Sequence, residues 1–315
     1  MSLPATGVGR GFGLEEEEGR SGGLWRDTMK NILRQRNARV GLAILIFLAL
    51  VAIFADQIST YGPNDVLDQV VAGAKKSSAP CIHLLGCPTS KPEFLMGTDP
   101  IVRDEFSRVV HGARVSLFVG FATVGFAIVI GSLFGLVSGY AGGWIDNVLM
   151  RFMDVLLVFP ALLLAIAIVS ALGHTLVNAQ IAIGIVAIPI YARIMRASVL
   201  SVKESDFVTA SRALGESPLG ILFRRILPNS ITPLIVAGTL GIAGAVLDVA
   251  ALSFLGLGAE PPLAEWGSMI GLDSGKVFTA PHLVFFPGFA LALTVFGFNL
   301  LGDGLRDALD PRLNR

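Results

Sequence analysis

"VSLFVGFATVGFAIVIGSLFGLVSG", residues 115–139, is a run of 25 residues without a single charged side chain. A helix needs roughly 20 apolar residues to cross the hydrocarbon core of a bilayer. Only a helix satisfies all of its own backbone hydrogen-bonding groups in lipid. Gly131, Gly135 and Gly139 recur at every fourth position, a spacing that lets two membrane helices approach closely. The stretch therefore predicts a transmembrane helix with one face packed against another helix.

Five more apolar stretches accompany this one, so the predicted fold is an all-α integral membrane protein with six transmembrane helices. The composition agrees, because 53% of the residues are hydrophobic and only 15% are charged, against about 25% charged in soluble domains. The predicted spans are residues 40–55 (extendable to 59), 115–139, 155–172, 176–190, 231–255 and 283–301. Pro160 and Pro189 interrupt spans 3 and 4 and permit kinks there. Ala237, Gly241 and Ala245 form a second ladder of small residues on span 5.

The basic residues predict that both termini lie in the cytoplasm. With the N-terminus inside, 17 of the 24 Lys and Arg residues fall on the inner side, as the positive-inside rule requires. We therefore expect a cytoplasmic segment 1–39, whose Gly- and Glu-rich stretch 1–24 is disordered, and an uncleaved first span at 40–59. An extracytoplasmic loop 60–114, a five-helix core 115–303 with an internal loop 191–230, and a cytoplasmic tail 304–315 complete the predicted organisation.

The internal loop contains "DFVTASRALGESPLGILFRRILPN", residues 206–229, which predicts a hairpin of two amphipathic helices. Gly215 suits a left-handed C-cap, and Ser217-Pro218 suits the N-cap and first position of the second helix. On a helical wheel, Phe207, Ala210, Ser211 and Leu214 share one face, and Thr209, Arg212 and Ala213 share the other. In the second helix Leu219, Leu222, Phe223, Ile226 and Leu227 share a face. Such a hairpin is either a rigid lever that transmits a push or an element that lies on the membrane surface without a partner.

This hairpin resembles the EAA loop in permeases of binding-protein-dependent ABC importers, whose pattern is E-A-A-x3-G followed by Leu-Pro. Thr209-Ala210-Ser211 stand in the E-A-A positions, Gly215 is the glycine, and Leu227-Pro228 is the end. The glutamate of the pattern is absent here. Arg225 stands where the peptide branch of the family usually has histidine.

Three other segments resemble the peptide/nickel branch of that family. "MGTDPIVRDEFSRVVHGARVSLFVG" is similar to its G-T-D-x-x-G-R-D-x-x-S-R…G-A-R-x-S-L pattern, with Val102 in place of a glycine. "GYAGGWIDNVLMRFMDVLLVFP" resembles its link between spans 2 and 3. "ALSFLGLGAEPPLAEWGSMI" resembles the outer end of span 5, although Val249 occupies the position of an expected Glu. The resemblance runs from about residue 30 to the C-terminus.

The resemblance implies a type I ABC importer permease of the inner membrane, multi-pass and not itself an enzyme. Its partners would be a second, homologous permease, two cytoplasmic ATPases that bind ATP and Mg²⁺, and an external solute-binding protein. The helix at 204–214 would be the coupling helix that docks on an ATPase. The implied coupling residues are Phe207, Thr209, Ala210, Ser211, Arg212, Leu214 and Gly215. Di- and oligopeptides are the expected substrates, with nickel chelates or oligosaccharides as the alternative. An ion-gradient-driven secondary transporter is the rival class, and it would predict matching broken helices in internal repeats.

Charged residues within spans suggest functional sites, because a charge in lipid is costly. Asp248 in span 5 either lines the translocation path, together with Ser253 and Phe254, or bonds to a neighbouring helix. Arg151 and Asp154 lie three apart on one helix face and can pair, which favours a structural role in fixing the helix geometry over a functional site.

Other motifs exclude several classes of function. Cys81 and Cys87 suit a small disulfide loop, with two free thiols as the alternative, and with His83 they lack the fourth ligand of a zinc site. "GLDSGKV", residues 271–277, is not a P-loop, and the sequence has neither HExxH nor G-x-S-x-G. We therefore expect no metal, no catalytic residues and no cofactor in this chain. The sequence has no basic stripe interleaved with aromatic residues, so nothing in it indicates nucleic-acid binding.

Overall fold

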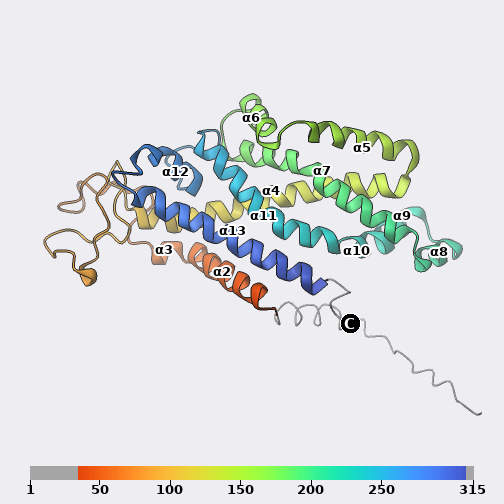
Figure 1. Cartoon of the computed structure of the whole chain (residues 1–315), viewed down its shortest axis with the longest axis horizontal. Helices are drawn as coiled ribbons and strands as arrows, with labels where there is room; N and C mark the ends of the chain where they lie inside the picture. Colours follow the sequence, from red (N-terminus) through yellow and green to blue (C-terminus); the bar gives the residue numbers. More distant parts are fainter. Residues whose placement is uncertain (1–34, 310–315) are drawn as a thin grey trace, which may run out of the picture.

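The computed structural model describes residues 35–309 and shows a bundle of long helices that run between two distinct ends (Figure 1). Within these residues no strand forms, and only two isolated β-bridges occur, Cys81 with Phe94 and Thr98 with Asp104. The predicted all-α class is therefore correct.

The α-helices are α2 (Arg36–Ile53), α3 (Ala55–Ile58), α4 (Glu105–Ala141), α5 (Gly143–Val158), α6 (Ala161–Leu172), α7 (Leu176–Lys203), α8 (Asp206–Ala213), α9 (Pro218–Gly220), α10 (Leu227–Ser230), α11 (Thr232–Phe254), α12 (Trp266–Asp273) and α13 (His282–Leu309). Three short elements complete the fold: the 3₁₀ turns η1 (His83–Leu85) and η3 (Ser274–Lys276), and the π-helical segment η2 (Ile221–Ile226).

Five single helices are long and apolar enough to cross a membrane, namely α2, α4, α7, α11 and α13. The predicted third span, 155–172, is not one helix. It is divided between α5 and α6, which meet at a bend of 93°. Pro160 causes the break, because it has no N–H to donate and forces the residue before it out of helical conformation. Phe159 accordingly has extended backbone angles. The pair counts as a sixth span only if the bent helices cross together.

Helix α7 extends 13 residues beyond the predicted end of span 4 at residue 190. Much of the predicted internal loop 191–230 is therefore helical, and Pro189 lies inside the helix. The extension is stabilised by packing rather than by hydrophobicity alone. Its buried residues Ala192, Met195 and Val199 lie against the glycine ladder of α4. A hydropathy window finds the portion of a helix that lipid surrounds, and α7 continues beyond that portion.

The glycine ladder packs as the sequence predicts. A Cβ on Gly131 would lie 2.7 Å from the carbonyl oxygen of Ile188, and one on Gly135 would lie 2.3 Å from that of Ala192. Only glycine permits this approach, which brings the backbones of α4 and α7 into contact. Bulky apolar side chains remain exposed elsewhere on the bundle, including Phe47, Phe118, Phe152 and Phe296. Such side chains suit a surface that faces lipid or the helices of another subunit.

Other boundaries also differ from prediction. The first span is interrupted at Phe54, where α2 ends and α3 begins. Helix α4 begins at Glu105, so the predicted outer loop 60–114 ends earlier, and the sequence did not predict α12. Span 5 agrees within one residue at each end, and α13 extends past 301 to Leu309. The predicted disorder of 1–24, most of the predicted segment 1–39 and the end of the predicted tail lie outside the described residues.

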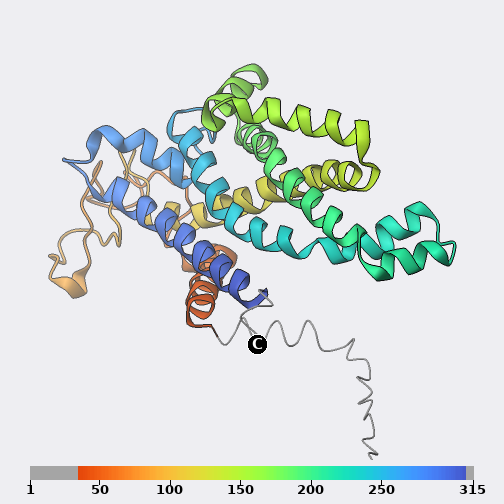
Figure 2. The ribbon, with the colours of Figure 1, turned by 45° about the vertical axis from the view of Figure 1, so that its right-hand side comes forward.

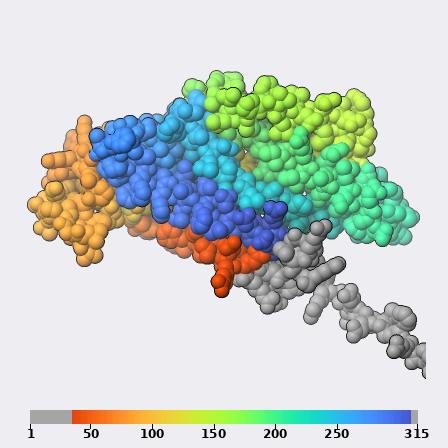
Figure 3. Space-filling model, viewed as in Figure 1, coloured from red at the N-terminus to blue at the C-terminus, as the bar shows by residue number. Residues whose placement is uncertain are grey.

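The loop before α4 and the hairpin after α7 lie at opposite ends of the bundle. Figures 1 and 2 show the loop, in orange, at one end and α8 and α9 at the other. The space-filling view shows the same separation of the two surfaces (Figure 3). This arrangement is what the predicted topology requires, since that topology places the two elements on opposite sides of a membrane.

Candidate functional site

The turn of the hairpin between α8 and α9 is built from the capping residues that the sequence predicts. Gly215 has a φ of +79°. Its N–H donates to the carbonyl of Arg212 at 3.1 Å, and the N–H of Glu216 donates to that of Ser211 at 3.1 Å. These two bonds form a Schellman motif. Ser217 then accepts a hydrogen bond from the N–H of Gly220 at 3.1 Å, so one helix ends and the next begins within four residues.

Helix α8 does not divide into the two faces that the helical wheel predicts. Val208 and Ser211, three residues apart, are its buried residues, and α8 packs against η2. Ser211 is therefore separated from the other members of its predicted face, Phe207, Ala210 and Leu214, which are exposed. Thr209, Arg212 and Ala213 on the predicted opposite face are exposed as well. The sequence contained one indication that Val208 is buried, since it is the only β-branched apolar residue of α8.

The second helix of the hairpin contains the π-helical segment η2, which changes the buried face. A π-helix bonds residue i to i+5, so residues five apart align, as Ile221 and Ile226 do in the core. A wheel drawn for an α-helix omits Ile221 and places Leu219 and Phe223 inside, whereas both are exposed. Arg225 donates from Nε to the Glu216 carboxylate at 3.1 Å and links the turn to this helix.

Two ion pairs hold α5 against α7, next to the hairpin. Arg196 donates to both carboxylate oxygens of Asp146 at 2.5 Å. Arg193 bonds Asp154 at 2.6 Å. The expected pairing of Arg151 with Asp154 is therefore wrong, because α7 supplies a partner that sequence spacing within one helix does not reveal. Helix α7, from which the hairpin continues, is thus joined to α5 as well as to α4.

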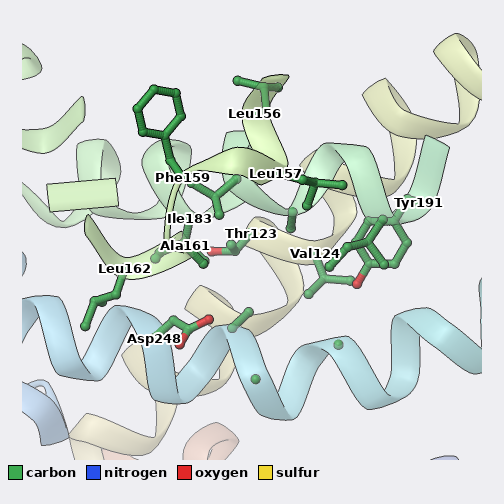
Figure 4. A pocket seen from close by; sticks show the side chains of 16 residues that line it. Thr123, Val124, Leu156, Leu157, Phe159, Ala161, Leu162, Ile183, Tyr191 and Asp248 are labelled. Atoms are coloured by element: carbon green, nitrogen blue, oxygen red, sulfur yellow. The ribbon is translucent and has the colours of Figure 1, made fainter. Parts of the chain in front are cut away.

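Asp248 lies on the wall of a cavity of about 240 Å³ between α4, the α5–α6 pair, α7 and α11. Figure 4 shows its carboxylate directed into this space, on the side of Thr123. Most of the other lining residues are apolar, and the polar exceptions are Thr123 and Tyr191. The cavity is thus an apolar space with one carboxylate.

Ser253 and Phe254, predicted to line a path with Asp248, do not line this cavity. Ser253 is buried at the end of α11, where its hydroxyl accepts a hydrogen bond from the N–H of Ala259 at 3.1 Å. Phe254 is exposed. The sulfur atoms of Cys81 and Cys87 are bonded in the structure, with Cα atoms 5.4 Å apart. Among residues 35–309, no group of three or more metal-binding side chains occurs.

Two family models match the chain. One describes a "Binding-protein-dependent transport system inner membrane component" and matches residues 131–315, more than half of the sequence. The other describes the "N-terminal TM domain of oligopeptide transport permease C" and matches residues 23–80. Together they cover both the helical core and the first span.

Curated relatives match nearly the whole chain. The dipeptide transport system permease protein DppC of Alkalihalophilus pseudofirmus is 45% identical over 92% of this chain and 90% of that protein. The glutathione transport system permease protein GsiD of Pectobacterium atrosepticum is 40% identical over 92% of this chain and 91% of that protein.

A solved structure also shares the fold. A chain of the MetNI methionine ABC transporter, in an inward-facing conformation, superposes with a TM-score of 0.53 at 20% identity, over 64% of this chain and 97% of that one. The predicted type I ABC importer permease fold is confirmed by this match. The chain belongs to the family of inner-membrane permease components of binding-protein-dependent ABC transport systems, in its DppC/OppC-like branch.

Proposed function

We propose that this chain imports short peptides as one of two permease subunits of an ATP-driven transporter. The observation that carries the substrate class is the set of relatives at 40–45% identity, whose names specify dipeptide, di/tripeptide and glutathione transport. Glutathione is itself a tripeptide, so these substrates share a small size, peptide bonds and a free carboxylate. Nickel chelates and oligosaccharides are the alternative substrates.

The second permease would resemble the B subunit of dipeptide or oligopeptide systems. Two cytoplasmic ATPases would bind ATP and Mg²⁺, and a binding protein would deliver peptide to the loop 59–104 and the neighbouring α12. In this arrangement the chain itself hydrolyses no ATP. It forms part of the translocation path and transmits the movement of the ATPases to that path.

The hairpin is the proposed contact with an ATPase. Four of its apolar side chains are exposed: Phe207, Leu214, Leu219 and Phe223. They project from a segment that also carries Arg212, Arg224 and Arg225, at the end of the bundle and not along its apolar flank (Figure 2). Exposed apolar side chains on a segment that also carries charged ones are typical of a protein interface. Its rigid caps and the packing of α8 on η2 allow it to move as one body with α7.

Leu214→Asp tests this contact. The side chain is 88% exposed, so the variant should change the free energy of unfolding by no more than about 0.5 kcal/mol. A charge placed in an apolar interface should nevertheless weaken ATPase binding at least tenfold. The measurement is the amount of ATPase that co-purifies in mild detergent with the tagged wild-type permease and with the tagged variant. Each permease is expressed together with the proteins encoded beside it.

Leu84→Asp is the matched control. Leu84 is 93% exposed but lies in the loop at the opposite end of the bundle, so this variant should retain the ATPase. Equal retention by both variants would remove the hairpin from the interface. Peptide uptake by the purified protein in vesicles without ATP, driven by an ion gradient, would instead support a secondary transporter.

A further inference from the structure

The face of α11 that borders the cavity consists of small residues and one acid. Gly241, Gly244, Ala245 and Asp248 follow one another at helical spacing and all line the space. A Cβ on Gly241 would lie 2.0 Å from the Tyr191 hydroxyl, so this glycine is needed for packing. A Cβ on Gly244 would meet no atom within 4 Å. The helix therefore leaves open room directly beside Asp248, one turn away.

The polar groups of the cavity have no partners among the residues that the structure describes. The Thr123 side chain is only 1% exposed, and its buried hydroxyl makes no hydrogen bond. Neither the Asp248 carboxylate nor the Tyr191 hydroxyl bonds to any group of residues 35–309. Buried polar groups such as the Thr123 hydroxyl are almost always paired in folded proteins. Asp248 is exposed in the isolated chain, and an unpaired acid within a membrane helix is a strong indication of a functional role.

We propose that this cavity is a binding subsite for the protonated amine of the transported solute, with Asp248 as its counter-ion. An ammonium group carries three donors and one positive charge, which matches the Asp248 carboxylate as counter-ion, with the Thr123 hydroxyl oxygen as a further acceptor on the same cavity wall. The apolar lining of the cavity lowers the effective dielectric constant beside such an ion pair and so strengthens it. The inference rests on the proposed function, in which the amine is the free N-terminus of a short peptide.

Position along the helix suits a transient site. Asp248 lies six residues before the end of α11, about 9 Å along the axis, and about 24 Å from the end next to the hairpin. A solute that has entered from the loop end would meet it before the longer, apolar portion of the path. Asp248 belongs to α11 and Thr123 to α4. Relative movement of these two helices would therefore separate the two groups and release the amine.

Asp248→Asn tests the charge of the site in the complete transporter. The complex, reconstituted in vesicles with its binding protein, is assayed for ATP-dependent uptake of radiolabelled dialanine. We expect uptake to fall at least tenfold in this variant. The ATPase rate stimulated by the loaded binding protein should stay within twofold of wild type, because docking and coupling are intact. Asp248→Glu should restore most of the uptake.

Gly244→Leu tests the space itself. The longer side chain enters open volume, so the protein should fold normally while the cavity is filled and uptake falls. Gly125→Leu is the matched control, since Gly125 on α4 also has open space at its Cβ but does not line the cavity. It should transport at close to the wild-type rate.

A thiol-protection assay identifies the recognised group. Both cysteines of the chain are in the disulfide, so Ala187→Cys in the cavity wall introduces a single reactive thiol. Millimolar dialanine should slow its labelling at least threefold, whereas N-acetyl-dialanine, which has no ammonium group, should not. The protection should disappear when Asp248→Asn is added.

Three results would overturn the inference. They are wild-type uptake by Asp248→Asn, equal protection by the two peptides, and loss of the second permease from purified Asp248→Asn complex, which would make Asp248 a subunit contact. A wild-type complex that takes up no dialanine would show instead that the proposed substrate class is wrong.

Discussion

Val102 shows how one residue can retain a conformation that suits glycine. Its φ is +66°, in the left-handed region that costs an L-residue about 1–2 kcal/mol, and the related pattern has glycine at this position. Its side chain is buried with Leu67 and Phe94. The packing of valine in this cluster therefore offsets some of the backbone cost.

The resulting prediction reverses the usual order of substitutions. Val102→Ala loses buried contacts and retains the unfavourable φ, whereas Val102→Gly loses the same contacts and relieves the φ. After allowance for the greater flexibility of glycine in the unfolded chain, Val102→Gly should be more stable than Val102→Ala by about 1 kcal/mol. Thermal unfolding of the two variants in detergent measures this difference. A more stable alanine variant would show that the backbone relaxes without cost.

Among the elements, the contact between α4 and α7 sets the position of the hairpin, which continues from α7. The contact depends on the glycine ladder, because the backbone of α7 approaches Gly131 and Gly135 directly and the Val199 side chain packs on Gly139. The ion pair of Arg196 with Asp146 adds α5 to the same unit. A displacement of the hairpin would therefore move this unit as a body.

Gly135→Ala should weaken this contact. Its Cβ would lie 2.3 Å from the Ala192 carbonyl oxygen and 2.8 Å from the Met195 Cβ, so the helices must separate, at a cost of about 1–3 kcal/mol. Gly125→Ala, on the same helix with open space at its Cβ, should cause no loss. The melting temperatures of both variants, measured by circular dichroism, test the expectation. Equal stability would mean that the two helices move apart freely.

Across the whole molecule, buried polar groups join the loop end to the helix bundle. Glu265 accepts hydrogen bonds from the N–H groups of Gly267 and Ser268 at 2.9 and 2.8 Å and caps α12. Trp266 donates to the Val109 carbonyl of α4 at 2.9 Å. Through α12, the loop end is therefore attached to the core on which the hairpin also depends.

This attachment predicts a dependence of global stability on pH. Burial raises the pKa of Glu265 above its ordinary value of 4.5, so the folded state holds its proton more tightly than the unfolded state. Stability must fall as pH rises from about 4.5 to the raised pKa, by at most about 1.4 kcal/mol per pH unit. Glu265→Gln does not titrate and isolates this effect. The difference in melting temperature, wild type minus variant, should decrease over this pH range, and a constant or increasing difference would contradict the assignment.

The membrane class, the approximate places of the apolar spans, the family and the caps of the hairpin could all be predicted from the amino-acid sequence. Each of these depends on local physics: hydrophobic length, the left-handed tolerance of Gly215, and the N-cap chemistry of Ser217. The glycine ladder was also readable, because small residues at fixed spacing have one main use in a membrane helix.

Where the elements end and which side chains face inward depended on tertiary packing. Packing against α4 allows α7 to continue far beyond its apolar stretch. The π-helical turn of η2 places Ile221 on the buried side and leaves Leu219 and Phe223 exposed. Arg193 reaches Asp154 from another helix, so no periodicity within α5 predicts the pair. The sequence shows Asp248 as a charge within a span, but the cavity around it exists only because five helices of the chain meet there. Contacts between distant segments depend on shape and volume, which hydropathy and spacing along a single helix do not encode.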